Sequence, residues 1–500
     1  NVYARPWGDF LRYSYYRFDF SDVKEPGIYT LAIGETETHP FQIHADIYDR
    51  HIWQPVLEYY LPVQMCHLRI NEKYRVWHDR CHMDDALMAP VDTNHFDGYK
   101  QGPETLTPFK PYEKVPDLNQ GGWHDAGDYD LRVESQIGTI WNLALMLEEF
   151  GIGDYDATTV DQTEGLVEIH QPDGISDMYQ QIDHGLRSVL GGYRALGRLY
   201  RGIICHDLRQ YVMLGDAASM TDNQWAETPG PGDDDRWVFT EENPGRELYV
   251  AAGLAAASRA LKTYDETLAS ECIQVAKALY ADAVKQAGNP VNRILALAEL
   301  ILATEDLAYG KELAQLEEDI LSNFGRVSWA VGRVKDQLAN EKLRHKLDKQ
   351  AQARAQTLLA NATTDSPYGV PYKPNIWGAG WNIQRFGVEQ YYFHKSWPQL
   401  ETESLFINAF NFIVGVHPGK NTASFASGIG SKSALVAYGV NRADWSYIPG
   451  GVASGTALIR PDLPEFKIWP FFWQQTEYVM GGGSTNFMFL ALAMQKRFGT

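Results

Sequence analysis

The sequence has 500 residues, of which 44% are hydrophobic, and a formal net charge of −20. A chain of this length can bury a large core and has room for one large domain and a smaller one. The acidic excess disfavours nucleic acid and anionic membranes as partners, because both attract clustered Lys and Arg. No apolar run reaches the roughly twenty residues that cross a bilayer, so we expect no transmembrane segment.

The first 45 residues predict a small β-structure. Strand-like segments lie at 17–20, 28–33 and 41–43, with the turn Glu25-Pro26-Gly27 before the second. These are too few strands for an independent sandwich. We therefore interpret residues 1–45 as the C-terminal part of a β-domain.

Residues 46–500 predict a second, mainly helical domain, because apolar side chains recur at helical spacing from about residue 130 onward. Beyond the helices expected around Ile140 and Leu186, helical stretches are predicted at 246–262, 268–287, 291–303, 310–323, 333–361, 400–414 and 486–497. Long loops are expected at 85–130, 222–245, 365–398 and 415–475. Loops of that length in a helical domain are more often functional than idle. The lysines of 333–361 alternate with acids, which is typical of a solvated helix face.

The glycine-rich stretch 121–130 contains the clearest candidate catalytic residues. Asp125 and Asp128 lie three residues apart, in a turn whose glycines allow unusual backbone angles, so both carboxylates can be aimed at one point. Trp123 and Tyr129 flank them with rings that suit stacking on a sugar. An acid pair beside aromatic rings fits proton abstraction from water at a glycosidic bond. The alternative is a plain surface turn, since Asp and Gly are ordinary turn formers.

This stretch resembles the signature of glycoside hydrolase family 9, the inverting cellulases built on an (α/α)6 barrel. The segment 19–43 resembles the end of the immunoglobulin-like domain in one branch of that family, and 411–419 is similar to the segment before its substrate-binding loop. The resemblance implies a mainly α fold, with an (α/α)6 barrel over 46–500 preceded by the remnant of an immunoglobulin-like β-sandwich over 1–45. It also implies inverting hydrolysis of β-glycosidic bonds, with an endo-β-1,4-glucanase as the default.

The resemblance further implies catalytic roles. Asp128 is expected to activate water as the general base with Asp125 assisting, and Glu477 is expected to protonate the leaving oxygen as the general acid. Burial beside aromatic residues would favour the protonated form of Glu477. The alternative for Glu477 is a solvated loop acid.

Two cysteines and two histidines form a second constellation, which suits tetrahedral Zn²⁺. The branch of the family with the immunoglobulin-like domain carries a structural zinc at corresponding positions, and one of the histidines adjoins Asp125. The alternative is two buried thiols with hydrogen-bonded histidines, and His67 is a rival ligand. Cys205 and Cys272 are expected to be core residues. The four predicted ligands are Cys66, Cys81, His82 and His124.

Calcium is uncertain. Many members of the family place a calcium-binding Asp and Glu where this chain has Gly245 and Tyr249, so the resemblance does not carry that site over. The run Asp233-Asp234-Asp235 offers oxygen ligands for Ca²⁺, although a solvated loop explains it as well.

The expected sugar-binding loop departs from the family. The His-His-Arg segment of the cellulases is absent, and Tyr438, Asn441, Arg442 and Trp445 stand in its place as substrate-binding candidates. Arg442 offers donors to sugar hydroxyls and Trp445 a stacking ring. The departure leaves an exo-acting β-glucosidase or β-glucosaminidase as the alternative, followed by a non-catalytic carbohydrate-binding protein. The expected partner is a β-glucan or a related polysaccharide or oligosaccharide. The sequence starts at Asn1 without Met or a signal-like segment, so it is interpreted as a processed or truncated product. A secreted or periplasmic location is expected.

Overall fold

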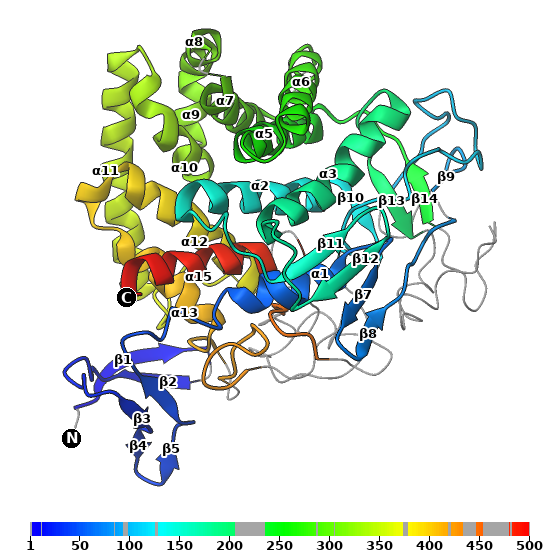
Figure 1. Cartoon of the computed structure of the whole chain (residues 1–500). Coiled ribbons are helices and arrows are strands. Elements are labelled where there is room, and N and C mark those ends of the chain that lie inside the picture. Colours follow the sequence, from blue (N-terminus) through cyan, green and yellow to red (C-terminus); the bar gives the residue numbers. More distant parts are fainter. Residues whose placement is uncertain are drawn as a thin grey trace.

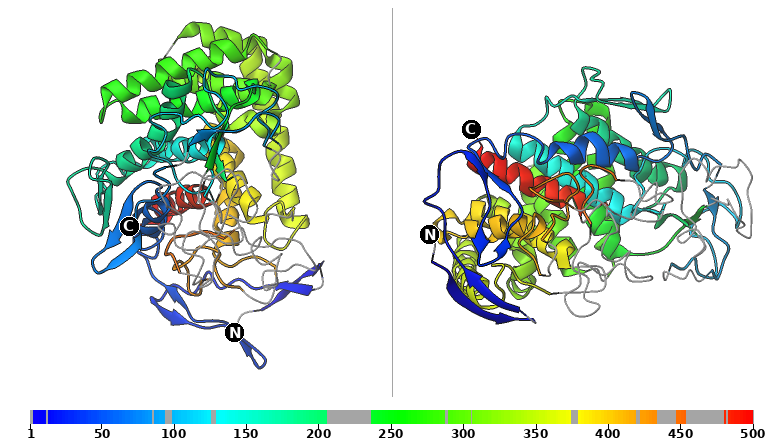
Figure 2. Two further views of the ribbon diagram at one scale, coloured as in Figure 1. Left: turned by 90° about the vertical axis from the view of Figure 1, so that its right-hand side faces the viewer. Right: turned by 90° about the horizontal axis from the view of Figure 1, so that it is seen from below.

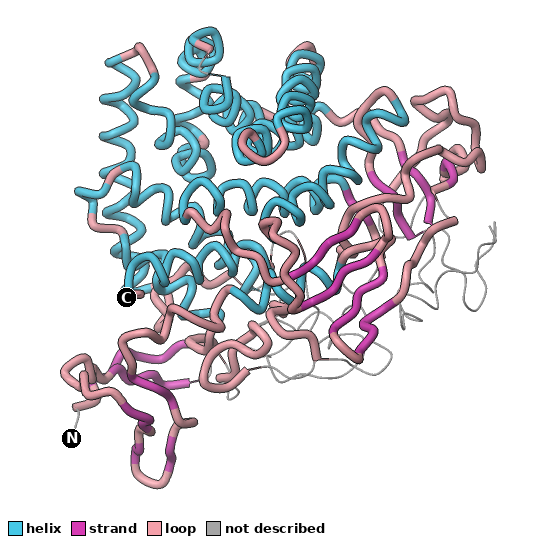
Figure 3. The backbone as a smooth tube through the Cα atoms, in the orientation of Figure 1, coloured by secondary structure: helices cyan, strands magenta, loops and turns pink. Residues whose placement is uncertain are grey.

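A computed structural model describes residues 3–11, 13–84, 86–93, 99–125, 129–205, 236–286, 289–304, 306–373, 379–418, 422–433, 447–453, 480 and 483–499. The chain is mostly helical, with a group of strands at the N-terminal end and others beside the helices (Figures 1 and 3). Within these residues, no helix is both long and apolar enough to cross a membrane.

Helices form a closed inner ring. Each helix of the ring contacts the next one, and the last helix contacts the first. In order around the ring they are α2 (Val133–Phe150), α5 (Pro244–Leu261), α7 (Pro290–Thr304), α10 (Phe324–Val334), α12 (Ala379–Ser396) and α15 (Ser484–Phe498).

A second set of helices packs outside the ring, each mainly against one inner helix. Following the order of the inner ring, they are α3 (Asp177–Leu196), α6 (Glu266–Ala283), α8 (Leu307–Gln315), α11 (Glu341–Thr364), α13 (Glu403–Ile413) and the π-helical turn η1 (Val56–Tyr60). Figure 2 shows this double layer from two further sides. The arrangement confirms the predicted mainly α fold and the (α/α)6 barrel.

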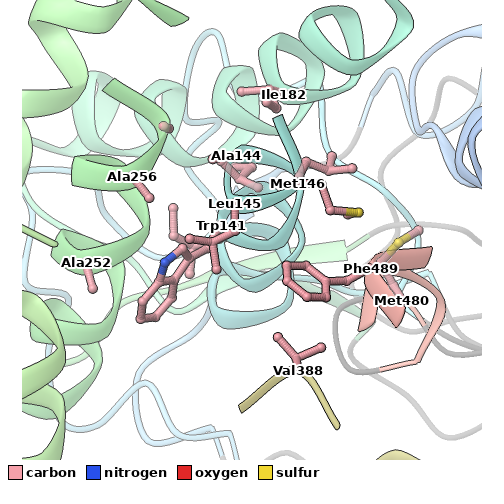
Figure 4. Packing of buried hydrophobic residues seen from close by; sticks show 14 of the residues in the cluster. Trp141, Ala144, Leu145, Met146, Ile182, Ala252, Ala256, Val388, Met480 and Phe489 are labelled. Carbon is pink, nitrogen blue, oxygen red and sulfur yellow. The ribbon is translucent and has the colours of Figure 1, made fainter. Parts of the chain in front are cut away.

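Small side chains allow the inner helices to approach one another. Helix α5 is rich in Ala, and its residues from Val250 to Ser258 are all buried. Figure 4 shows Trp141 of α2 lying beside Ala252 and Ala256 of α5, with Phe489 of α15 on the other side of α2. A large aromatic side chain thus packs against alanines, which keeps the interior close-packed.

Two short four-stranded sheets tie together the loops at one end of the barrel. The first has the order β10 (Leu131–Arg132), β13 (Gly202–Cys205), β14 (Arg236–Phe239), β9 (Leu87–Met88). The second has the order β11 (Thr158–Asp161), β12 (Leu166–Ile169), β7 (Arg69–Glu72), β8 (Arg75–His78). Strand pairs β9 with β14 and β7 with β12 are parallel, and the other pairs are antiparallel.

The N-terminal strands form three separate pairs. These are β1 (Arg5–Phe10) with β2 (Tyr13–Arg17), β3 (Gly27–Tyr29) with β6 (Phe41–Ile43), and β4 (Ala32–Ile33) with β5 (Thr36–Glu37). The first pair packs on the barrel, where the hydroxyls of Tyr15 and Tyr368 lie 2.6 Å apart. The strands fit the predicted remnant of an immunoglobulin-like domain. The boundary between 1–45 and 46–500 stays a prediction.

Several predicted boundaries are wrong. The segment 28–33 is divided between β3 and β4, and 18–20 is not a strand. The segment 310–323 is divided between α8 and α9 (Glu317–Ser322), because Leu316 leaves the helical conformation. The segment 333–361 also breaks, since α10 ends at Val334 and Asn340 begins α11 by accepting the backbone N–H of Leu343 at 3.0 Å.

The largest error concerns the predicted loop 365–398, which contains the inner helix α12. The buried positions of α12 include Gly380, Gln384, Gly387 and Gln390, so its apolar periodicity is weak. Gly387 is required by packing, because a Cβ built there would lie 2.7 Å from the Cβ of Ala409 on α13.

Candidate active site and metal centre

The turn that begins at Gly121 is fixed from two sides. Gly121 has a φ of +68°, and a Cβ there would lie 2.3 Å from the backbone oxygen of His184 on α3. Gly122 donates its N–H to the same oxygen at 3.0 Å, and Nε2 of His184 lies 2.8 Å from the oxygen of Gly122. Only glycine allows the turn to lie this close to α3.

Backbone bonds also join this turn to the segment that carries Cys66. The N–H of Cys66 donates to the oxygen of Gly122 at 2.9 Å, and the N–H of His124 donates to the oxygen of Gln64 at 2.9 Å. Trp123 thus pairs with Met65 as an antiparallel bridge, which holds the turn against a second buried segment.

Trp123 and Tyr129 are almost completely buried, at 0% and 1% exposure. The indole N–H of Trp123 donates to Oε1 of Gln181 at 2.9 Å, and the ring of Tyr129 packs on His82 and His124 at centroid distances of 5.0 and 4.9 Å. Neither ring presents a face to a ligand, so the predicted sugar-stacking role of both does not fit this structure. They pack beneath the turn instead.

Asp125 lies at the edge of the buried region, with 8% exposure. Nε of Arg132 lies 3.1 Å from its Oδ2 and 3.5 Å from Oδ2 of the buried Asp130, so one guanidinium bridges two carboxylates. The backbone oxygen of Asp125 accepts the N–H of Met480 at 2.8 Å. Since α2 and α15 begin shortly after Asp125 and Met480, this contact lies at the N-terminal end of the inner ring.

A cavity of about 390 Å³ opens at the same end of the ring. Its walls come from the inner helices α2, α5, α10, α12 and α15. The aromatic residues that line it are Trp141, Tyr249, Trp329 and Trp381, and the principal polar residues are Glu134, Asn142, Asn382, Arg385, Glu389 and Asn486. A pocket with several rings and a few convergent polar groups suits a sugar, which has apolar faces and a rim of hydroxyls.

Two indole N–H groups beside this cavity lack a hydrogen-bond partner in the described part of the chain. The Nε1 atoms of Trp329 and Trp381 are buried, and within the described ranges neither has a hydrogen-bond acceptor. Arg385 exposes 46% of its side chain and binds Glu389 at 3.1 Å. Burial raises the pKa of Glu389, although the charge of Arg385 opposes that effect. Sequence reasoning missed these residues, and the spacing of Trp381 and Arg385 by one helical turn was the available indication.

A neighbouring cavity of about 470 Å³ lies over the N-terminal ends of α5 and α7 and shares Glu134 and Tyr249 with the first. Its acidic groups already have cationic partners. Glu134 binds Arg201 and Arg246, and Arg246 also binds Glu241. Burial raises the pKa of Glu134, but the charges of Arg201 and Arg246 hold it below its usual value. The carboxylates of Glu134 and Glu241, which Ca²⁺ would need as ligands beside Gly245, are thus already paired with arginines.

The four predicted metal ligands come together in a second, closed site. All four are buried, and one ligand atom from each lies within 4.8 Å of the others. Sγ of Cys66 lies 3.7 Å from Sγ of Cys81 and 3.6 Å from Nδ1 of His82, and Sγ of Cys81 lies 3.6 Å from Nε2 of His124.

The rival ligand His67 lies outside this group. Its Nδ1 lies 3.1 Å from the backbone oxygen of Gly121. Cys205 and Cys272 are buried, as predicted, and none of the four cysteines is in a disulfide.

The surroundings favour the metal-binding protonation state at Cys66, His82 and His124. At Cys81, burial and the neighbouring Cys66 sulfur raise the pKa of the thiol well above its usual value. Burial raises the pKa of the Cys66 thiol, but the hydrogen bond from Cys81 and the charges of His67 and Arg236 bring it well below its usual value. Nη2 of Arg236 lies 3.5 Å from that sulfur. Burial lowers the pKa of His124 to about 4 and that of His82 well below its usual value, so both rings are neutral near pH 7.

The other predicted site residues lie outside the described residues. They are the catalytic candidates Asp128 and Glu477, the substrate-binding candidates Tyr438, Asn441, Arg442 and Trp445, and the acidic run Asp233-Asp234-Asp235.

Comparisons with known proteins agree with this architecture. The chain is 25% identical over 275 residues to endoglucanase D of Acetivibrio thermocellus, a match that covers 53% of this chain and 36% of the relative. It thus spans about a third of the length of the curated relatives that it matches.

Solved structures share the fold at low sequence identity. The family 9 endoglucanase J30 is 17% identical, with a TM-score of 0.75 over 99% of this chain and 93% of that one. A zinc-binding triple mutant of J30 is 18% identical, with a TM-score of 0.73 over 97% and 90% of the two chains. The sequence profile of Glycosyl hydrolase family 9 matches residues 54–438. Because that match covers most of the sequence, the chain belongs to Glycosyl hydrolase family 9.

Proposed function

We propose that this protein is an inverting glycoside hydrolase that cleaves internal β-1,4 bonds of a glucan. The observation that carries the proposal is the 2.8 Å bond from the N–H of Met480 to the oxygen of Asp125. Asp128 follows Asp125 by three residues, and Glu477 precedes Met480 by three. Three residues of extended chain span at most about 11 Å, which limits how far each acid can lie from this bond. We propose that both acids face the same point.

The proposed reaction is a single displacement. Asp128 takes a proton from water as the water oxygen forms its bond to the anomeric carbon, while the bond from that carbon to the leaving oxygen breaks and Glu477 supplies the leaving oxygen with a proton. The bridge from Arg132 to Asp125 keeps the assisting carboxylate in one orientation. An inverting mechanism requires a separation of roughly 6.5–9.5 Å between the carboxyls of Asp128 and Glu477.

The cavity of about 390 Å³ supplies the sugar-binding surface in this proposal. Trp381 and Trp329 offer ring surface, and Arg385 offers charged donors to hydroxyls. Endoglucanase D and endoglucanase J30 are both named for internal cleavage, which supports the endo mode for their relative described here.

A hydrolysis panel tests the proposal. Carboxymethylcellulose, mixed-linkage glucan, xyloglucan, cello-oligosaccharides and chitosan oligosaccharides are incubated with the protein, and viscosity and product sizes are followed in time. A rapid fall in viscosity, with inverted anomeric configuration of early products by proton NMR, is the expected result. Monosaccharide release at nearly constant viscosity would instead assign an exo-acting β-glucosidase or β-glucosaminidase. Binding without hydrolysis would assign a carbohydrate-binding protein.

We also infer that Zn²⁺ is the ion suited to Cys66, Cys81, His82 and His124. In a tetrahedral site with Zn–S near 2.3 Å and Zn–N near 2.05 Å, two sulfurs lie about 3.8 Å apart and a sulfur and a nitrogen about 3.6 Å apart. The distances of 3.7 and 3.6 Å here match those values. When bound, zinc would supply structural cross-linking and no proton chemistry, since four protein ligands leave no open position. Its ligand His124 would then fix the turn that carries Asp125.

We expect the protein to act outside the cytoplasm, secreted or in a periplasm, because a polymeric glucan does not cross a membrane. Fractionation of the producing cells, followed by detection of this chain in medium, periplasm and cytoplasm, tests that expectation.

A further inference from the structure

A buried cluster of charges adjoins the cavity from inside the barrel. Glu299 of α7 is completely buried, and its carboxylate binds Arg333 of α10 and Arg259 of α5, the latter at 2.6 Å. A third donor is the indole N–H of Trp141 on α2, whose Nε1 lies 3.0 Å from Oε1 of Glu299. One carboxylate thus links α2, α5, α7 and α10.

Trp141 is also part of the cavity wall. Its ring packs against Tyr249 and Trp329, which line the same cavity, at centroid distances of 5.5 and 5.7 Å. An indole side chain turns about two bonds, so a hydrogen bond at Nε1 together with two ring contacts leaves it one orientation. Figure 4 shows this ring lying between α2 and the alanines of α5.

We infer that Glu299 is a positioning residue for the substrate cavity, acting through the hydrogen bond that it accepts from Trp141. The two arginines hold the carboxylate in place, and the carboxylate holds the indole plane that forms one wall of the cavity. This inference rests on the proposed function, because it takes the cavity to be the place where sugar binds.

The electrostatics agree with an ordered, ionised acceptor. Burial raises the pKa of Glu299, but the charges of Arg333 and Arg259 bring it below its usual value, so the carboxylate stays charged at neutral pH. Buried ion pairs can often be replaced by apolar residues without loss of stability, so stability alone is a weak reason for this cluster. The need for an acceptor that fixes the orientation of Trp141 explains why the cluster contains a charged carboxylate.

A double-mutant cycle tests the inference. Glu299→Gln, Trp141→Phe and the double variant are compared with the unmodified protein in hydrolysis of a soluble cello-oligosaccharide. Trp141→Phe keeps an aromatic ring and removes only the N–H donor and part of the ring area. We expect Glu299→Gln to raise KM about threefold to tenfold with a smaller change in kcat, and to have less than a twofold effect in the Trp141→Phe background. Equal effects in both backgrounds would overturn the inference.

A matched control separates positioning from stability. Glu148 binds Arg259 and Arg333 as well, and within the described residues it makes no hydrogen bond to Trp141. Glu148→Gln should lower the melting temperature while leaving KM within about twofold, since it leaves the bond to Trp141 intact. A rise in KM equal to that of Glu299→Gln would show that any loss from the cluster disturbs the cavity.

Tryptophan fluorescence of the free protein distinguishes this inference from the proposed function. The emission of Trp141 is taken as the difference between spectra with and without Trp141→Phe. Glu299→Gln should shift this difference spectrum, and an unshifted spectrum would overturn the inference even in an active enzyme. If the unmodified protein hydrolyses no glucan in the panel, the proposed function fails instead, and the spectrum still reports on the link from Glu299 to Trp141.

Discussion

The backbone N–H of Met480 donates to the backbone oxygen of Asp125 at 2.8 Å, which joins two segments more than 350 residues apart in the sequence. Asp125 ends the turn fixed by α3, and Met480 precedes the inner helix α15. Both acids proposed for the chemistry lie three residues from an end of this bond. Their roles can therefore be separated by substitutions that leave the bond in place.

Substrates with different leaving groups separate the base from the acid. Asp128→Ala should abolish turnover of every substrate, because no group then takes the proton from water. Glu477→Ala should stop cleavage of cello-oligosaccharides but spare dinitrophenyl glycosides, whose leaving group departs without protonation. Initial rates on both substrate classes check this. If Glu477→Ala lowers the initial rate equally on both substrate classes, Glu477 is not the general acid.

Metal analysis tests the proposed zinc site. Protein purified without added metal should contain about one zinc per chain, and Cys81→Ser should lower the zinc content and the melting temperature more than the affinity for substrate. The reason is that the four predicted ligands are buried and none of them lines the cavity. The measurements are elemental analysis and calorimetry with and without chelator.

The matched control for Cys81→Ser is Cys272→Ser. Cys272 is equally buried, on α6, and lies outside the metal cluster. The Cys272→Ser variant should retain zinc, and chelator should destabilise it no more than it destabilises the unmodified protein. A zinc content near zero in the unmodified protein, with stability unaffected by chelator, would refute the site.

The grouping of the four predicted metal ligands followed from their residue types and from the family resemblance, and the turn followed from its glycine-rich composition. Cys81 and His82 are adjacent in the sequence, and His124 directly precedes Asp125. Few assumptions about the three-dimensional arrangement were therefore needed. The mainly helical class followed from apolar periodicity, which is clear in α3, and the (α/α)6 barrel followed from the family resemblance.

The cavity could not be predicted in the same way. Its lining residues come from five inner helices, most of them from α2 and α12, and their proximity depends on closure of the ring. Helix α12 was missed because Gly and Gln occupy much of its buried face. The burial of Trp123 was missed for a related reason, since its polar partner Gln181 lies on a different element, α3. Strands of two to four residues are too short for a period to be recognised.

The pH dependence of stability should include a contribution from His184. Burial lowers the pKa of His184 to about 3, and the neutral ring bridges Gly122 and Gln162 at 2.8 and 3.0 Å. Between pH 3 and 6.5 the unfolded chain binds a proton that the folded ring does not, so this contribution to stability decreases as pH falls through that window. Near pH 5 the loss is on the order of 2 kcal/mol.

Urea unfolding at pH 7 and pH 5 of the unmodified protein and of His184→Gln checks this. The variant is less stable at both values, because it loses the bridge, but its stability should decrease less between them. An identical decrease in both proteins would show that His184 is protonated in the folded state at pH 5.

Arg442 belongs to the stretch predicted to stand in place of the His-His-Arg segment of the family's cellulases. If its guanidinium binds a sugar next to the cleaved bond, Arg442→Ala should reduce kcat/KM by the equivalent of about 2–3 kcal/mol, as for a charge-assisted hydrogen bond. Steady-state kinetics on cello-oligosaccharides measure this, with Lys432→Ala, in the neighbouring exposed segment, as the control. A loss no larger than that of the control would place Arg442 away from the substrate.

The close approach of the turn to α3 predicts that two glycines with nearly the same backbone angle will differ in their tolerance of alanine. Gly151, at the end of α2, has a φ of +64°, and a Cβ there meets no atom within 4 Å. Gly151→Ala should therefore cost only about 1 kcal/mol, the strain of a left-handed alanine. Gly121→Ala bears the same strain and also places its Cβ against the oxygen of His184, at 2.3 Å. Since the backbone of α3 cannot move aside without repacking, the free energy of unfolding should decrease by roughly 3 kcal/mol or more.

Hydrolysis by Gly121→Ala should decrease even at temperatures where this variant is still folded, because the turn that carries Asp125 is displaced. Gly151→Ala should stay as active as the unmodified protein. Equal melting temperatures and equal activities of the two variants would show that the turn can leave α3 without cost, and the fixed turn on which the proposed site depends would have to be abandoned.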